Sequence, residues 1–176
     1  ELMGLKINRF KQLNSLIKNK IFLNNLISNV SSILYFIKKK KFNSIIINYD
    51  EKLENFLKWY QQLVAESLGK KSKGVLPIIS NMPKDNHSVM QLYLDGFKNN
   101  FYTFFYVKEN ASEKINNLKL LSKYKFLKNK NLDNIISAQK TATEKVFNKK
   151  KIPFRSFEIT NRDEEVLGEL FSFFIL

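Results

Sequence analysis

The chain has 176 residues, the length of one domain, and its 44% hydrophobic and 14% aromatic content excludes global disorder. It contains no cysteine, which excludes disulfides and thiolate metal sites, and no apolar run approaches the roughly 18 residues that span a bilayer, so we predict a cytoplasmic protein. The formal net charge is +14, which raises the possibility of a nucleic-acid-binding module. Only Arg9, Arg155 and Arg162 carry the forked guanidinium that suits phosphates and base edges, so the number of lysines is the one feature that supports this class.

Hydrophobic periodicity predicts helices that alternate with short strands. In chain order we predict a helix at 22–38, a strand at 45–49, a helix at 53–68, a strand at 75–79, a helix at 87–95, a strand at 101–107, a polar surface excursion at 110–129, a helix at 132–146, a strand at 154–160 and a helix at 163–176. Strands separated by helices of this length predict an α/β fold with a largely parallel sheet that helices cover on both faces.

The two ends of the sequence carry a separate expectation. Residue 1 is Glu, and the chain stops at Phe173–Leu176, within an apolar helical stripe that has no capping residue. We therefore expect a segment of a longer protein, truncated at both ends.

One pair of polar residues is a candidate site on the helix predicted at 53–68. Gln62 and Glu66 are four residues apart, so both lie on the face opposite the apolar stripe. In most proteins a pair at this spacing is only part of a solvated surface. A glutamate in the last helical turn before Gly69 can also serve as a general base, so both interpretations stay open at this point.

His87 is the only histidine of the chain. We expect it in the first turn of the helix predicted at 87–95, where the positive helix end favours the neutral imidazole, which can both donate and accept a proton. One histidine cannot build a metal site by itself, and neither a Gly-rich nucleotide motif nor a Ser-His-Asp arrangement is present. We predict no metal and no cofactor.

Three stretches of the sequence carry a resemblance to a known family. WYQQLVAESLGK at 59–70, with KGVLP at 73–77, resembles the Gln-Gln-x-x-x-Glu-Ser-x-Gly-Lys segment of bacterial-type glucose-6-phosphate isomerases, and DNHS at 85–88 with QLYLDG at 91–96 resembles that family's catalytic-histidine segment. The tail is similar at FEI (157–159), DEE (163–165), LG (167–168), Phe171 and FF (173–174). Because the stretches follow the family's order, the chain is identified as a segment of the C-terminal half of such a protein.

This resemblance implies the architecture of the chain. The family has the sugar-isomerase (SIS) fold, a mainly parallel sheet flanked by helices, and this chain would be most of the second of two such domains. Residues 1–44 would be a helical lead-in from the preceding domain, and residues 45–176 an incomplete C-terminal sugar-isomerase domain. The family's phosphate cradle, its Gly-Gly-Arg segment and its catalytic lysine would lie outside the chain.

The resemblance also implies a reaction and the residues that perform it. The family interconverts glucose 6-phosphate and fructose 6-phosphate through a cis-enediol, in glycolysis and gluconeogenesis, without a metal or cofactor. Glu66 would move the proton between C2 and C1, and Gln62 would contact the substrate or support the site. His87 would assist ring opening in the site of the neighbouring subunit, so the active protein would be a homodimer.

Two alternatives from other classes remain. The first is a non-catalytic sugar-phosphate-binding domain of the same fold, as found in regulators, which needs neither Glu66 nor His87. The second is the nucleic-acid-binding module, whose affinity would fall steeply with salt. On the isomerase interpretation the partners are the two hexose phosphates and a second copy of the chain, with no nucleic acid and no membrane.

Overall fold

The structure is a computed structural model that describes residues 8, 13–71, 73–108, 112–116 and 118–176. The strands are β1 (Asn43–Asn48), β2 (Leu76–Asn81), β3 (Asn100–Val107) and β4 (Phe154–Ile159). The helices are α1 (Leu13–Leu16), α2 (Lys20–Lys38), α3 (Glu54–Leu68), α4 (Asp85–Ser88), α5 (Met90–Asp95), α6 (Leu118–Lys123), α7 (Leu132–Lys149) and α8 (Glu164–Ile175), with short 3₁₀ turns at Glu51–Leu53 and Lys125–Leu127.

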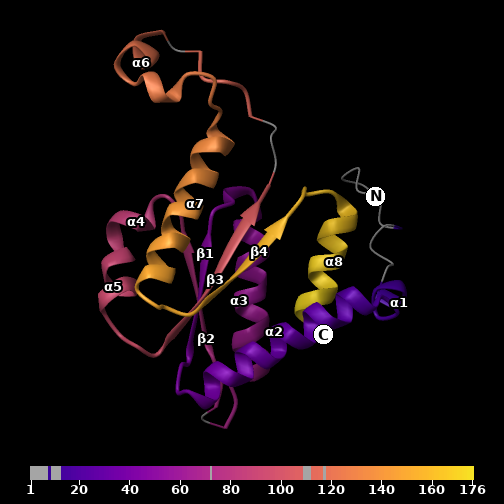
Figure 1. The fold of residues 1–176 in the computed structure, drawn as a ribbon. Coiled ribbons are helices and arrows are strands. Elements are labelled where there is room, and N and C mark those ends of the chain that lie inside the picture. Colours follow the sequence, from indigo (N-terminus) through magenta and orange to yellow (C-terminus); the bar gives the residue numbers. More distant parts are fainter. Residues whose placement is uncertain (1–7, 9–12, 72, 109–111, 117) are drawn as a thin grey trace.

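The strands form one sheet in the order β2-β1-β3-β4, and every pair is parallel, which confirms the predicted α/β class. Ile46 of β1 lies opposite Ile79 of β2 and Thr103 of β3. In a parallel sheet all strands start at one edge and end at the other. We call these the amino edge, at the bottom of Figure 1, and the carboxyl edge, toward which the arrowheads point.

Both faces of the sheet are buried, as expected when helices cover a parallel sheet on both sides. Ile45 and Ile47 of β1 face one core, while Ile46 between them faces the other. The first core also contains Tyr93 of α5 and Phe147 of α7. The second contains residues of α3 and α8: Phe56, Leu57, Tyr60 and Leu170. Helices α3 and α8 therefore cover one face of the sheet, and α5 and α7 cover the other (Figure 1).

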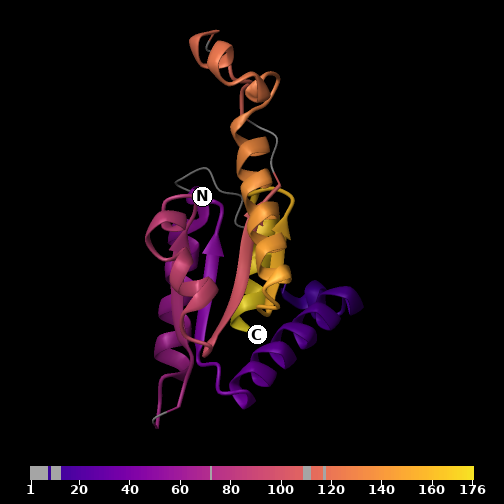
Figure 2. The same ribbon diagram turned by 60° about the vertical axis from the view of Figure 1, so that its left-hand side comes forward.

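Helix α2 packs on the same sheet. Asn19 caps its start, because the Asn19 side chain accepts hydrogen bonds from the backbone N–H groups of Ile21 and Phe22. Phe36 stacks on Phe101 of β3 with 5.1 Å between the ring centroids. In Figures 1 and 2 the helix crosses the lower part of the molecule, near the amino edge.

The predicted elements are present, with one difference in the helix expected at 87–95. This segment is two short helices, α4 and α5, which Val89 separates with φ −128° and ψ −10°, outside the helical region. The first helix begins at Asp85, two residues earlier than predicted. The polar stretch between β3 and α7 is the predicted excursion, and it stands away from the sheet at the carboxyl edge (Figures 1 and 2).

Candidate functional site

Helix α3 carries the first two candidate residues, and its packing fixes their position. Leu57 is fully buried, and Phe56 packs against Phe105 of β3 with 6.5 Å between centroids. The Gln61 side chain donates a 2.8 Å hydrogen bond from Nε2 to the carbonyl oxygen of Pro77, at the start of β2. This bond ties the second half of α3 to the sheet, so the opposite face of the helix is held toward solvent.

Gln62 and Glu66 lie together on that solvent face, as predicted. The Gln62 amide donates a 2.8 Å hydrogen bond from Nε2 to Oε1 of Glu66. Both residues are exposed. The hydrogen bond thus engages Oε1 of an exposed carboxylate. An amide that orients one carboxylate oxygen leaves the other available to accept a proton.

Two glycines fold the following loop back onto the end of α3. A Cβ atom on Gly69 would lie 2.4 Å from the carbonyl oxygen of Ala65, a distance that side-chain carbons do not tolerate. Gly74 has φ +143°, in the region that favours glycine, and a Cβ there would lie 3.1 Å from the carbonyl oxygen of Leu68. The loop that bears Lys70, Lys71 and Lys73 is therefore close to the turn that contains Glu66.

His87 lies at the other end of the sheet, in α4, which follows β2 directly. The Asp85 carboxylate holds this turn, because its Oδ2 accepts hydrogen bonds from Asn81 N (2.8 Å) and Ser80 Oγ (3.0 Å). The expectation that His87 starts a helix spanning 87–95 is wrong, since α4 is one turn long and His87 is its third residue. His87 therefore does not lie at the start of a helix that extends to residue 95.

The structure does not bring Glu66 and His87 together within one chain. Helix α3 starts at the carboxyl edge and ends at the amino edge, so Glu66 lies near the start of β2, while His87 follows its end. A six-residue strand at ~3.3 Å per residue separates the two edges by roughly 20 Å. One hexose phosphate cannot contact both residues across that distance.

The carboxyl edge contains a polar network that the sequence did not reveal. Arg162 donates two hydrogen bonds to Asp50, from Nε at 2.9 Å and Nη2 at 2.8 Å, and Asp50 is 5% exposed. The Asn48 side chain donates to Asn81 Oδ1 at 2.9 Å. These residues fix the strand ends beside which α4 and His87 lie. The position of Asp50, directly after the strand predicted at 45–49, was the sequence signal that could have pointed to this network.

A second buried charge lies between α7 and β4. Lys140 is 4% exposed and forms ion pairs with Glu144, at 3.0 Å, and with Glu158. Burial by itself lowers the pKa of Lys140, but hydrogen bonds to Glu158 and Glu144, together with their negative charges, raise this pKa above its ordinary value. Lys140 is therefore a buried cation held by two carboxylates, within the helix–sheet packing.

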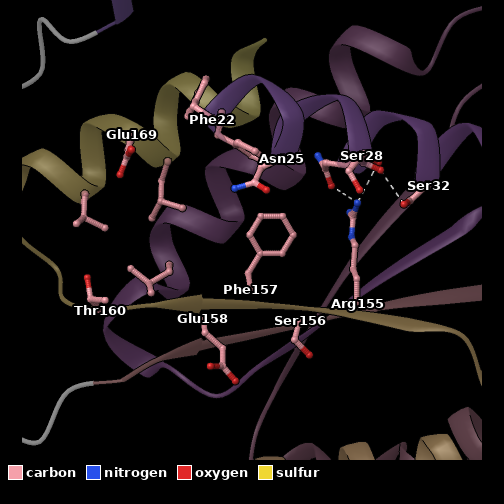
Figure 3. A pocket seen from close by; sticks show the side chains of 15 residues that line it. Phe22, Asn25, Ser28, Ser32, Arg155, Ser156, Phe157, Glu158, Thr160 and Glu169 are labelled. Atoms are coloured by element: carbon pink, nitrogen blue, oxygen red, sulfur yellow. Dashed lines mark hydrogen bonds between the residues drawn. The ribbon is translucent and has the colours of Figure 1, made fainter. Parts of the chain in front are cut away.

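One cleft in the described part of the chain is separate from all three predicted site residues. It has a volume of about 510 Å³ and lies between α2, β4 and α8. Figure 3 shows Arg155 and Phe157 rising from β4 into the cleft, whereas Ser156 and Glu158 point to the other side of the strand. The Arg155 guanidinium donates to Thr103 Oγ1 at 2.9 Å and to Asn29 on α2. Arg155 therefore joins α2 to the sheet.

Metal and membrane features are absent from the described residues. Within the ranges given above, no three His, Cys, Asp or Glu side chains are grouped so that they could hold a metal ion. In the same part of the chain, no helix combines the length and the apolar character required to cross a bilayer.

Comparisons with known proteins agree on one family. The chain is 32% identical over 180 residues to glucose-6-phosphate isomerase of Methanocaldococcus jannaschii, which covers 96% of the chain and 43% of that protein. It is 32% identical over 167 residues to the glucose-6-phosphate isomerase of Mycoplasmopsis pulmonis, covering 93% and 39%. The chain thus spans less than half the length of these curated relatives. No family model matches it.

A solved structure supports the fold. The crystal structure of a hypothetical protein from Thermus thermophilus superposes with a TM-score of 0.83 and 18% sequence identity, over 98% of this chain and 43% of that one. At this identity the likeness concerns the fold alone. The sequence relatives carry the assignment, and they confirm the family that the sequence resembles: the chain corresponds to a segment of the glucose-6-phosphate isomerase family.

Proposed function

We propose that this chain supplies the proton-transfer glutamate of a cytoplasmic enzyme that interconverts glucose 6-phosphate and fructose 6-phosphate. The observation that carries the proposal is the exposed, hydrogen-bonded Gln62–Glu66 pair within the segment that resembles the family's glutamate motif. The names of the curated relatives support the same reaction. Residues 45–176 would be the C-terminal sugar-isomerase domain and residues 1–44 its lead-in, with the rest of the site outside these 176 residues.

Glu66 performs the central step of the proposed mechanism. Its Oε2 accepts the proton from C2 of the open-chain aldose while the carbonyl oxygen at C1 gains a proton, which gives a cis-enediol. Return of the proton to C1, with loss of the hydroxyl proton at O2, gives the ketose. Atoms and electrons balance without an external oxidant, so the step needs no redox cofactor. Gln62 holds Oε1 and keeps the carboxylate oriented.

His87 has a separate role in the proposal, namely ring opening in the site of a neighbouring subunit. The placement of Glu66 and His87 at opposite edges of the sheet supports this division, because one chain cannot apply both residues to one sugar. In a dimer with two-fold symmetry each site could combine Glu66 from one subunit with His87 from the other.

The substitution Glu66→Gln in the intact protein tests the first role. The amide keeps the shape of the side chain and loses its basicity, so we expect turnover and solvent-hydrogen exchange at C2 to fall by about 10² to 10⁴. Hexose phosphate binding should change little. Glu51→Gln, at the opposite edge of the sheet, is the matched control. Near-normal exchange in Glu66→Gln would remove Glu66 from the mechanism, and binding without any turnover in the unaltered protein would favour the non-catalytic alternative.

Subunit mixing tests the shared site. Glu66→Gln and His87→Ala subunits, each impaired alone, should regain activity when mixed, because a mixed dimer contains one site with both residues intact. If subunit exchange is demonstrated and no activity returns, His87 does not act across the interface. The purified 176-residue chain alone should show no isomerase turnover, and measurable turnover would contradict the proposal that the remaining site residues lie outside it.

A further inference from the structure

Lysines gather at the amino edge of the sheet. The loops that precede the four strands, together with the helix ends that lead into them, carry eleven of them: Lys38, Lys39, Lys40, Lys41, Lys70, Lys71, Lys73, Lys98, Lys149, Lys150 and Lys151. We call this set the amino-edge lysines. They are dispersed over more than one hundred residues of sequence, and the parallel topology brings them to one edge.

Two side-chain contacts join the segments that carry these lysines. Lys41 donates from Nζ to the carbonyl oxygen of Lys98 at 2.5 Å, which joins the loops before β1 and β3. Lys150 pairs with Asp95 at 2.5 Å, which joins the end of α5 to the loop before β4. Burial, and then the positive charge of Lys98, lower the pKa of Lys41 below its ordinary value. Lys41 and Lys98 are thus close enough for their positive charges to interact.

Few negative charges offset this surface. Among the described residues of these loops and of the adjoining helix ends, the carboxylates are Glu66 and Asp95, and Asp95 is already paired with Lys150. Glu66 accepts its hydrogen bond from the neutral Gln62. The proposed proton-transfer residue therefore lies in a strongly positive surface, beside the loop that folds back onto α3.

Three of these lysines occupy backbone conformations that favour other residues. Lys40, Lys71 and Lys151 have φ of 59°, 54° and 56°. Glycine and asparagine adopt this left-handed region more readily than lysine. Lysine thus stands at three turns of one edge despite its conformational cost, which suggests that its charge has a use there.

We propose that the amino-edge lysines attract the dianionic hexose phosphate toward Glu66, a role that rests on the proposed function. A phosphate monoester carries a charge of about −1.5 to −2 at pH 7, and a positive surface raises its local concentration and its association rate. Lysine suits this role because a hydrated point charge attracts an anion without the bidentate grip of arginine. Product, which carries the same charge, can then leave.

Two variants of equal charge test the proposal in the intact protein. The amino-edge variant carries Lys40→Asn, Lys71→Asn and Lys73→Gln, in which asparagine tolerates the left-handed backbone. The control carries Lys123→Gln, Lys125→Gln and Lys128→Gln, three exposed lysines of the excursion at the carboxyl edge. Both lose three positive charges. Activity is measured at ionic strengths of about 0.01 and 0.15 M, where the screening length is ~30 and ~8 Å.

The amino-edge variant should lose about 3- to 10-fold in kcat/KM at the lower ionic strength, with kcat unchanged, and much less at the higher one. The control should match the unaltered protein. Equal kcat/KM in both variants would overturn the proposal while the isomerase function stands. If the unaltered protein shows no isomerase turnover, the proposed function fails. Calorimetry with glucitol 6-phosphate then tests the amino-edge lysines alone. Weaker binding only in the amino-edge variant supports their attraction of the anion, and equal binding in both variants overturns it.

Discussion

The two edges of the sheet handle charge in opposite ways. At the carboxyl edge, Asp50 is paired with Arg162, and the Asp85 carboxylate accepts hydrogen bonds from Ser80 and Asn81. At the amino edge, the described lysines are largely exposed, and Lys150 forms an ion pair with Asp95. The carboxyl edge uses its charges to fix its own geometry, and the amino edge presents its charges to solvent.

This contrast indicates which edge contributes to folding and which to ligands. Buried, hydrogen-bonded charges are costly to disrupt, whereas exposed ion pairs add little to stability. Substitutions at the carboxyl edge should therefore change the free energy of unfolding, and those at the amino edge should mainly change the response to anions.

Asp50→Ala should have the largest effect. It removes the buried carboxylate that accepts two hydrogen bonds from Arg162, and we expect a loss of about 3 kcal/mol in the free energy of unfolding. Urea denaturation measures this loss. Asp95→Ala removes an exposed carboxylate of the amino edge and should leave the urea midpoint unchanged. Equal shifts for the two variants would contradict the division between the edges.

Lys140→Met should cost about 2 kcal/mol near neutral pH, because Glu144 and Glu158 lose the cation that they share. The folded-state pKa of Lys140 is raised, so its contribution is fully present below about pH 10.4 and is lost as the pH rises through the folded-state value. Urea midpoints of the variant and the unaltered protein should therefore converge at alkaline pH. A constant gap would show that the lost stability is packing rather than charge.

Gly69→Ala should destabilise the end of α3 by about 1.5 kcal/mol, since the added Cβ would meet the Ala65 carbonyl oxygen at 2.4 Å. Movement of that turn should also lower turnover, because Glu66 lies in it. Ser67→Ala, at an exposed position two residues earlier, is the control. Thermal unfolding and activity assays separate the two effects, and a variant with normal stability would mean that the turn can relax.

Substitutions of the adjacent Gln61 and Gln62 should give the smallest changes in stability, and they separate a structural role from a catalytic one. Gln61→Ala removes the hydrogen bond to Pro77 and should cost about 1 kcal/mol, with turnover largely retained. Gln62→Ala should leave stability unchanged and lower turnover by on the order of 10-fold, since Glu66 loses its orienting partner. The reverse pattern would exchange the roles assigned to the two residues.

Much of the fold follows from local sequence. The four strands and the helices α3, α7 and α8 lie close to the predicted ranges, because apolar periodicity and β-branched runs act over a few residues. The break at Val89 was missed, since no glycine or proline marks it. Helix α4 begins at Asp85, whose carboxylate accepts a hydrogen bond from the backbone N–H of Asn81 at the end of β2. Hydrophobic periodicity does not reveal such a contact.

The candidate site likewise has features that the sequence predicts and features that depend on the three-dimensional fold. The contact between Gln62 and Glu66 follows from helical spacing alone, and their shared exposed face could be predicted. The pairing of Asp50 with Arg162 joins residues 112 positions apart, and no local pattern indicates it. The amino-edge lysines were visible as separate runs, but their assembly on one surface depends on strand order and direction.

The excursion between β3 and α7 has a consequence for engineering. At its base, the backbone N–H of Ser112 donates a 3.0 Å hydrogen bond to Oδ2 of Asp133, and Lys114 forms an antiparallel bridge with Asn131. The free energy of closing a loop rises slowly with its length, so a clamped base tolerates changes beyond it. We therefore expect residues 122–130 to accept an inserted peptide tag or fluorescent domain while the sheet keeps its register.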